Sequence, residues 1–264
     1  LFLIFFISIA LFLIIPNFFD YEKKAKYIKD YLYKNYGFEV YDFDKIKFQS
    51  LPLPRLIIKN ADINILDLNI KLVSESFSIY PKLFSIYNYK NFDLRKVKFD
   101  SSKLVIQSSK LNLLIKNLVN LRKKFYFEDL NLLITDKKIE VINVKKIDLS
   151  NYGYKKNKIQ GEVFNTKFKI KLKDDLSNIH FKLLNTGISA NLNLFDKQES
   201  NEFIGEIRGK ILNSNLKLNF IYDLKKFEIN NFFYRGKDLS FDSNGTLGLK
   251  PYFVVNLKSK IKDI

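Results

Sequence analysis

Residues 167–173, Lys-Phe-Lys-Ile-Lys-Leu-Lys, alternate a lysine with an apolar side chain along their whole length. Successive side chains of a β-strand point to opposite faces of the sheet, so this alternation is typical of a strand with one apolar face and one hydrated face. The apolar members are Phe168, Ile170 and Leu172. The stretch therefore predicts a sheet that is exposed to water on one side, which is the usual property of antiparallel sheets.

The same period of two returns later in the chain, over most of residues 212–222 and again in residues 253–261. Its apolar members include Leu216, Leu218, Phe220, Val255 and Leu257. Asn244-Gly245 lies between two apolar runs and predicts a two-residue hairpin turn. Residues 76–88 lack the alternation, and we expect a loop or short helix there. The pattern favours antiparallel meanders over βαβ units, and the fold class predicted is mainly β.

The amino-acid composition also favours strands. The chain has 264 residues, with 26 Phe and 15 Tyr but no Trp, Met or Cys. Aromatic residues fit a pleated sheet surface well. The lack of Cys excludes disulfides, thiolate metal sites and cysteine nucleophiles. Because Met is absent, we do not expect Leu1 to be the natural N-terminus.

The net charge of +17 first suggests nucleic acid or an anionic membrane as a partner. Few of the basic residues are Arg, which binds phosphate and guanine in a bidentate manner better than Lys does. The lysines are also spread along the chain instead of forming one block. We therefore interpret the charge as a solvated lysine-rich surface and expect no nucleic-acid partner.

Residues 1–19 contain no charged side chain. A helix of this length spans about 28 Å, close to the roughly 30 Å hydrocarbon core of a bilayer, so the segment predicts a transmembrane anchor. A cleaved signal peptide would end in a small-x-small site, but Ser8 and Ala10 lie in mid-segment and apolar residues continue after them. The signal peptide and a buried core helix remain alternatives. Lysines soon after residue 19 favour a cytoplasmic main domain, yet long domains translocate largely regardless of charge, so orientation stays open.

Residues 20–37 have the features of a short amphipathic helix. Asp20 can cap its start, Ile28 and Leu32 belong to an apolar stripe at helical spacing, and Gly37 lies where a C-terminal glycine is expected. The stripe either faces a membrane surface or packs on the domain that follows.

Residues that could carry catalysis are scarce. His180 is the only histidine, and the alternation places it on the polar face of its strand beside Lys182. A hydrated surface position explains it better than a catalytic role. We expect no enzyme activity, no cofactor and no metal site.

The order of segments in the N-terminal part is informative. After the helix ending at Gly37 comes Leu51-Pro52-Leu53-Pro54-Arg55-Leu56-Ile57-Ile58-Lys59-Asn60-Ala61-Asp62-Ile63. Pro81-Lys82-Leu83-Phe84, Leu94-Arg95-Lys96-Val97-Lys98-Phe99 and Leu104-Val105-Ile106 follow. This order resembles the N-terminal region of AsmA-like proteins of Gram-negative envelopes, which have a single anchor, a helix ending near glycine and a Pro-x-Pro-like turn into a strand. The likeness covers residues 1–150. The chain is richer in Lys and Asn than the family and shorter, as though its C-terminal part were missing.

The resemblance implies a protein related to the bridge-like lipid transfer proteins, attached to the inner membrane with its main domain in the periplasm. It also implies a long sheet that curls into a β-groove with an apolar inner face. We thus expect an anchor at 1–19, a membrane-proximal helix at 20–37 and a groove domain at 38–264. The expected function is to shield or conduct phospholipid or another envelope lipid toward the outer membrane and to support outer-membrane assembly. Candidate lining residues are Phe168, Ile170, Leu172, Leu216, Leu218, Phe220, Val255 and Leu257.

Other interpretations remain open. The apolar strand faces could instead meet and form an ordinary sandwich core. A scaffold or assembly factor for outer-membrane proteins would offer strand edges to its partners. A basic module would bind anionic surfaces such as lipid headgroups.

Overall fold

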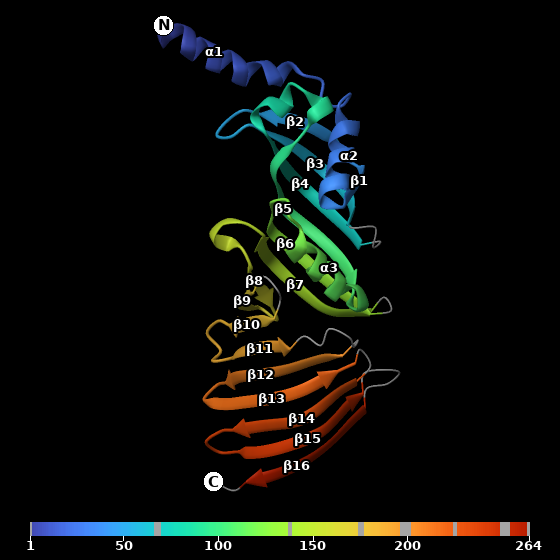
Figure 1. Ribbon diagram of the computed structural model, residues 1–264, viewed down its shortest axis with the longest axis vertical. Coiled ribbons are helices and arrows are strands. Elements are labelled where there is room, and N and C mark those ends of the chain that lie inside the picture. The colour runs from blue at the N-terminus through green and yellow to red at the C-terminus, as the bar shows by residue number, and fades with distance from the viewer. Residues whose placement is uncertain are drawn as a thin grey trace. The chain divides into compact units, whose positions relative to one another are not determined.

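The computed structural model describes residues 2–65, 70–136, 139–173, 177–195, 202–223, 226–248 and 254–262. The fold is mainly β and mostly antiparallel, as predicted (Figure 1). The chain divides into two compact units, Leu1–Phe164 (unit 1) and Asn165–Ile264 (unit 2).

The N-terminal segment of unit 1 is helical over less of its length than expected. Helix α1 covers Phe2–Ile14, and the short 3-10 helix η1 covers Ile15–Phe18. Pro16 has no backbone N–H and its ring clashes with the preceding turn, so it ends the regular α-helix. The predicted transmembrane helix over residues 1–19 is therefore wrong in extent. Within the described part of the chain, no helix combines the length and apolar character needed to cross a membrane.

The second helix, α2 (Ala25–Tyr36), lies within the range predicted for it. The Asp20 carboxylate accepts the backbone N–H groups of the turn that precedes α2. Gly37 has a left-handed conformation (φ 67°), and its N–H closes the helix. Ile28, Leu32 and Tyr36 on α2 are buried in the core of unit 1. Of the two interpretations of the apolar stripe, packing on its own domain is therefore the one observed.

Unit 1 contains one sheet, in the order β1-β3-β4-β5-β6-β7-β8, with β2 paired to β3. The strands are β1 (Phe38–Asp42), β2 (Lys45–Gln49), β3 (Arg55–Ile65), β4 (Ile70–Pro81), β5 (Leu94–Gln107), β6 (Phe125–Asp136), β7 (Ile139–Ser150) and β8 (Lys158–Val163). Short 3-10 helices η2 (Leu83–Ile86), η3 (Tyr89–Asn91) and η4 (Gly153–Lys155) lie in its connections. The expected loop at 76–88 is wrong in its first half, because β4 continues to Pro81 and pairs with β5 there.

One connection in unit 1 departs from the expected meander. Strands β5 and β6 are parallel, and α3 (Ser108–Asn120) joins them. A parallel pair cannot be closed by a tight turn and needs such a crossover. The prediction against βαβ units is thus wrong at this point.

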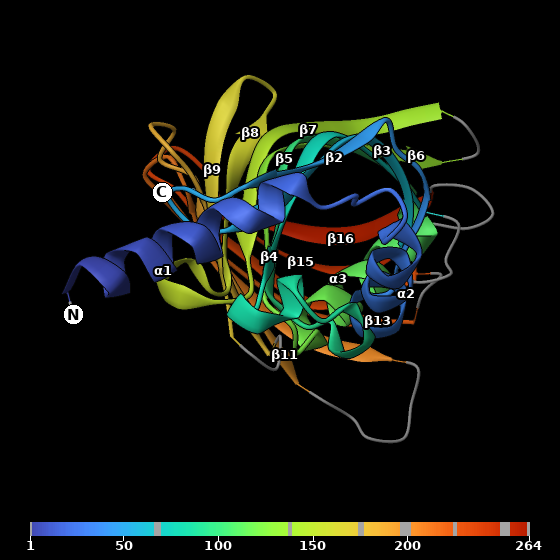
Figure 2. The ribbon, with the colours of Figure 1, turned by 90° about the horizontal axis from the view of Figure 1, so that it is seen from above.

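Helices α2 and α3 cover the same face of the unit 1 sheet, where they enclose its core (Figure 2). At the centre of this core, Phe99 is fully buried and its ring contacts those of Phe38, Phe77 and Phe127, with centroids 4.7–5.4 Å apart. The predicted strong curl is not observed. In unit 1 the two helices occupy the face that a curled sheet would have to enclose.

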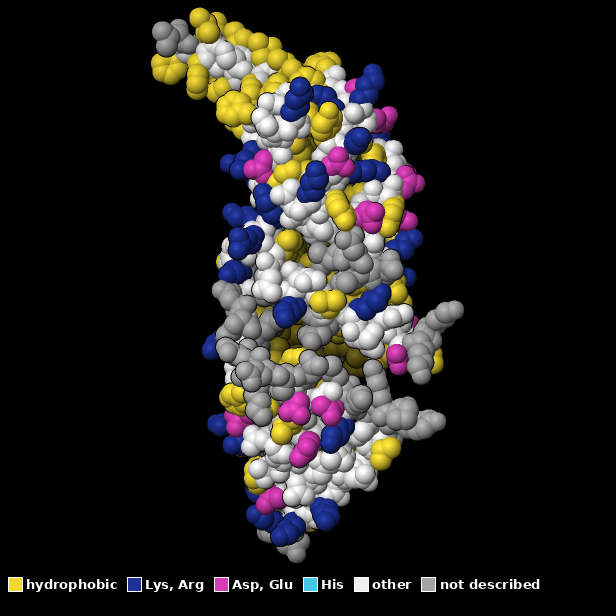
Figure 3. Space-filling model, turned by 45° about the vertical axis from the view of Figure 1, so that its right-hand side comes forward, with side chains coloured by type: hydrophobic (Ala, Val, Ile, Leu, Met, Phe, Trp, Pro, Cys, Tyr) yellow, Lys and Arg dark blue, Asp and Glu magenta, His cyan; other side chains and the backbone are white. Residues whose placement is uncertain are grey.

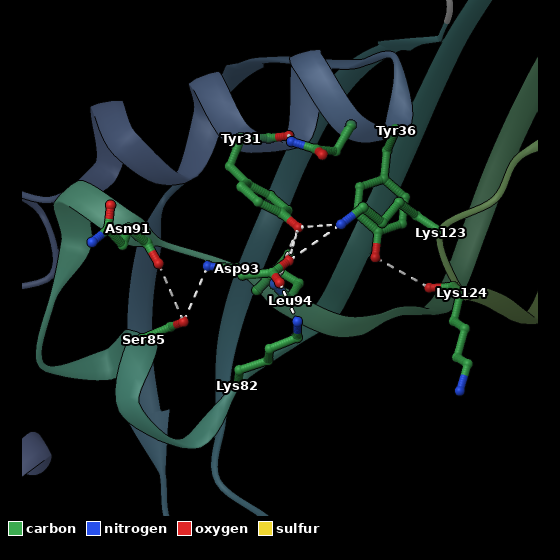
Figure 4. A network of polar contacts seen from close by, with 10 residues as sticks. Tyr31, Tyr36, Lys82, Ser85, Asn91, Asp93, Leu94, Lys123 and Lys124 are labelled. Carbon is green, nitrogen blue, oxygen red and sulfur yellow. Dashed lines mark hydrogen bonds and ion pairs between the residues drawn. The ribbon is translucent and has the colours of Figure 1, made fainter.

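A polar cluster joins α2 to the sheet connections of unit 1 (Figure 4). The Tyr31 hydroxyl donates to the Asp93 carboxylate and accepts a hydrogen bond from Lys123 Nζ at 2.9 Å. Asp93 also pairs with Lys82 at 2.5 Å and with Lys123 at 3.2 Å. Burial alone would raise the pKa of Asp93, but hydrogen bonds from Lys82, Tyr31 and Lys123 outweigh it and hold the pKa far below its usual range.

Replacing Asp93 with Asn should lower the free energy of unfolding of unit 1 by about 1.5–3 kcal/mol at pH 7, because charge-assisted hydrogen bonds are lost. The folded-state pKa is depressed, so the stabilisation by Asp93 is present above the unfolded pKa of about 3.9 and is lost as pH falls below it. The gap between wild type and variant should therefore shrink between pH 5 and pH 2 in urea titrations. Asp30→Asn, on the exposed side of α2, is the matched control and should cost under about 0.5 kcal/mol. A gap independent of pH would contradict the role given to Asp93.

Unit 2 is a sheet whose strands follow one another in sequence order (Figure 1). The strands are β9 (Thr166–Leu172), β10 (Asn178–Leu183), β11 (Ser189–Phe195), β12 (Phe203–Ile211), β13 (Ser214–Tyr222), β14 (Lys226–Arg235), β15 (Ser240–Gly248) and β16 (Val254–Lys262). All the strand pairs between β9 and β16 are antiparallel, and no helix occurs in the residues of this unit that the structure describes.

The predicted hairpin at Asn244-Gly245 is wrong. Both residues lie within β15, paired with β16 across its whole length. Gly245 has φ +146°, and a Cβ at this position would come within 2.0 Å of the Asn256 carbonyl oxygen. The glycine thus permits close approach of two strands instead of a turn.

Candidate functional site

All eight predicted lining residues lie on one face of the unit 2 sheet. Residues directly opposite each other in an antiparallel pair share a face, so the strand registers allow that face to be traced from strand to strand. On β9, Phe168, Ile170 and Leu172 pair with alternate residues of β10, of which Phe181 is the central one.

The registers carry this face across the rest of the sheet. One row of cross-strand partners runs through its middle: Leu172, Ile179, Leu192, Ile207, Leu218, Phe232, Ser243 and Ser259. Leu216 and Phe220 flank Leu218 on β13 and point the same way, as do Val255 and Leu257 on β16. Seven inter-strand spacings of about 4.8 Å make the row about 34 Å long. We call this surface, with its flanking rows, the apolar face.

Aromatic rings form a large part of the apolar face. Tyr222 stacks on Phe227 with centroids 4.3 Å apart, and Tyr234 stacks on Phe241 at 5.2 Å. The ring of Phe220 lies over Gly205, its partner on β12, where a Cβ would come within 2.5 Å of it. An aromatic ring over a strand glycine covers backbone that a missing side chain would leave open.

The residues of unit 2 that the structure describes form no second layer over this surface. Most side chains of the apolar face are half-buried, and Val255 and Leu257 are exposed at 49% and 41%. Large apolar side chains that pack only against their sheet neighbours keep much of their area available for a further contact.

Two polar side chains on the apolar face satisfy each other. Ser243 and Ser259 are directly opposite one another, and their hydroxyl oxygens are 2.6 Å apart. A hydroxyl that is hydrogen-bonded within the protein costs little when water is removed from it. The apolar face can therefore lose its water without leaving these two groups unpaired.

The opposite face of the unit 2 sheet is polar and charged. Glu206 pairs with Lys217 at 3.0 Å and with Arg208, and the Arg208 guanidinium followed by Lys217 lowers the pKa of this carboxyl. His180 lies on this face, as predicted, with its Nδ1 2.6 Å from the Asn191 side-chain oxygen. Within the described part of the chain, no group of three or more His, Asp or Glu side chains could hold a metal ion.

Several residues of the apolar face were missed from the sequence. Gly205 and Gly209 interrupt the apolar alternation around Ile207. A bulge in β14 between Ile229 and Phe232 shifts the alternation by one residue, so apolar side chains on both sides of it share a face despite their spacing. The repeated aromatic residues of 227–234 were the available signal, but they do not reveal the bulge.

No family model, no curated protein and no solved structure matches the chain. The AsmA-like resemblance of residues 1–150 accordingly stays a prediction.

Proposed function

We propose that the chain is a non-enzymatic, membrane-attached envelope protein whose apolar face shields the acyl chains of a lipid. The observation that carries this proposal is the continuous cross-strand row on unit 2, over which the described residues of unit 2 form no covering layer. Because the predicted strong curl is not observed, the proposal concerns an apolar sheet surface and not a curled trough.

The energetics favour such a surface over a compact chemical site. Moving a 16-carbon acyl chain through water exposes methylene groups worth about 0.8 kcal/mol each, or roughly 13 kcal/mol in total. An extended surface of mostly aliphatic and aromatic side chains offsets this cost along the length of the acyl chain. A few polar side chains in a pocket would not.

Attachment to a membrane is supported by α1. Apart from Ser8, its side chains are all apolar, and most are exposed, with Phe2 at 82% and Phe6 at 65%. Figure 3 shows the helix as an almost continuous hydrophobic surface (Figure 3). We propose that residues 1–19 hold the chain to the inner membrane, with the main domain in the periplasm, as the resemblance implies.

A second candidate is an assembly factor that pairs a strand edge with outer-membrane proteins. Strand β16 is last in the strand order, and all its residues are exposed, including Ile261 at 72%. Exposed edges of this kind are templates for pairing with another chain. This candidate predicts protein crosslinks concentrated on β16.

The proposal is tested by native mass spectrometry of the full chain, extracted from bacterial membranes in a mild detergent and washed with excess detergent. We expect one or more phospholipids to stay bound after the wash, because the apolar face keeps acyl chains out of water. A chain that carries no lipid under these conditions, together with protein crosslinks on β16, would replace this proposal with the assembly factor.

A further inference from the structure

A pocket in unit 1 combines positive charge with an apolar wall. It has a volume of about 240 Å³. Its lining comes from the turn before β3, the end of β4, the start of η2, the start of β5, the residue before β6 and the segment before η4. Arg95, Lys96 and Lys124 supply three cations, and Tyr80 and Tyr152 supply two aromatic rings. Apolar side chains complete the wall: Leu53, Pro54, Pro81 and Leu83.

The pocket carries uncompensated charge. No carboxylate lines it, and within the described residues Arg95, Lys96 and Lys124 form no ion pair. Lys98, two residues after Lys96 on β5, is paired with Asp100 at 2.7 Å and also with Glu128. The pocket therefore differs from the neighbouring surface of the same sheet, where cations are neutralised.

Aromatic rings lie against the two lysines of the pocket. Lys96 Nζ lies 4.4 Å from the Tyr80 ring centroid and 5.8 Å from that of Tyr152, and Lys124 Nζ lies 5.9 Å from the Tyr152 ring. Arg55 donates a hydrogen bond to the Tyr80 hydroxyl at 3.3 Å, which fixes that ring. Cation–π contacts orient an ammonium group without neutralising its charge, so the group stays available to an anion.

The apolar wall continues into the surface around α1. Leu53 and Leu83 are exposed at 50% and 46%, and the residue after Leu83, Phe84, is exposed at 74%. The Phe84 ring contacts the ring of Phe12 on α1, with centroids 6.0 Å apart. A ligand that fits this pocket therefore has an anionic group for the three cations and, next to it, apolar groups that contact this wall.

We infer that this pocket binds the phosphate-bearing headgroup of an anionic lipid. The phosphate lies beside Arg95, Lys96 and Lys124, and the first carbons of the acyl chains lie against Leu53 and Leu83. This site is separate from the apolar face and does not depend on the function proposed for it. Near an anionic membrane surface, every one or two Lys or Arg residues raise the binding affinity about tenfold.

The inference is tested with the full chain in neutral detergent micelles that contain equal amounts of phosphatidylglycerol and phosphatidylcholine. Native mass spectrometry gives the ratio of the two lipids retained. Wild type should retain phosphatidylglycerol over phosphatidylcholine by about tenfold or more. The triple variant Arg95→Gln, Lys96→Gln, Lys124→Gln should lower that ratio below about twofold.

A charge-matched control removes three lysines from the polar face of unit 2: Lys169→Gln, Lys171→Gln, Lys182→Gln. It should keep the wild-type ratio, and a ratio lowered as much as in the pocket variant would overturn the inference in favour of general charge attraction. Lys96→Arg with Lys124→Arg keeps the charge and should keep the preference, which separates loss of charge from loss of folding. Loss of the acyl-chain role alone would remove lipid that is held on the apolar face without regard to its headgroup, so the ratio would not fall.

A free phosphate ion carries the same anionic group as a lipid headgroup and is the alternative ligand for the three cations. Inorganic phosphate, added at the same ionic strength as a chloride control, should lower the phosphatidylglycerol ratio only modestly, because it gains nothing from the apolar wall. Tight phosphate binding that depends on the three cations, with no lipid preference, would overturn the assignment to a lipid.

Discussion

Leu218→Glu is expected to reduce the phospholipid retained by the detergent-washed chain at least tenfold. Leu218 lies in the middle of the cross-strand row, between Ile207 on β12 and Phe232 on β14. A carboxylate here must lose its water when an acyl chain covers it, which costs several kcal/mol, and about 1.4 kcal/mol already corresponds to a tenfold change in affinity. Without lipid, the half-buried position leaves the carboxylate hydrated, so the sheet should still fold.

The matched control places the same charge on the other face of the same strand. Asn215 lies on the polar face of β13, opposite Lys210 on β12 and Arg235 on β14, so Asn215→Glu adds a carboxylate between two cations. This variant should retain as much lipid as wild type in the same mass-spectrometric measurement. Equal retention by Leu218→Glu would show that lipid is held elsewhere, and equal loss by both variants would point to net charge.

Phe99→Ala should lower the free energy of unfolding of unit 1 by about 3–5 kcal/mol. Phe99 has no exposed surface, and its ring contacts three other phenylalanine rings. Removing the Phe99 ring leaves a cavity between the rings on β1, β4 and β6. Because these strands hold their rings in place, the cavity can collapse only partly. Urea titrations followed by circular dichroism measure the change.

Phe84→Ala is the control for ring loss at the surface. Phe84 is 74% exposed, so its replacement should change the unfolding free energy by less than about 0.5 kcal/mol. A cost below about 1.5 kcal/mol for Phe99→Ala would mean that the aromatic core repacks freely, contrary to the description of unit 1.

Strands β9, β13 and β16 of unit 2 could be predicted because each has one wet face. Lys167 to Lys173 alternate without interruption, and the structure places the apolar members of β9 on one face with those of β13 and β16. Periodicity gave the face of each strand separately but not the pairing between strands. Bulges and strand glycines, as at Gly205 and in β14, change the alternation for reasons that lie in the partner strand.

Unit 1 was harder to predict because tertiary packing decides it. The crossover helix α3 buries Leu114 and Leu118, which are at helical spacing. The sequence on either side of them is, however, as rich in Leu and Asn as the strands are. Pro16 is visible in the sequence, but the prediction of a helix over residues 1–19 rested on the length of the segment and its lack of charge. The cationic pocket joins Leu53, Lys96, Lys124 and Tyr152, which only the sheet brings together.

The strict sequence order of the strands in unit 2 has a consequence for assembly. Between β9 and β16 each strand pairs with the strands next to it in sequence, so the sheet is a linear array whose stability is a sum of nearest-neighbour terms. Such contacts are short in sequence and can form hairpin by hairpin as the chain emerges, without waiting for a distant segment. Inserting or deleting one whole hairpin preserves the direction and facing of every other strand. The reach of the surface is therefore a modular property that evolution or design can lengthen in steps of two strands.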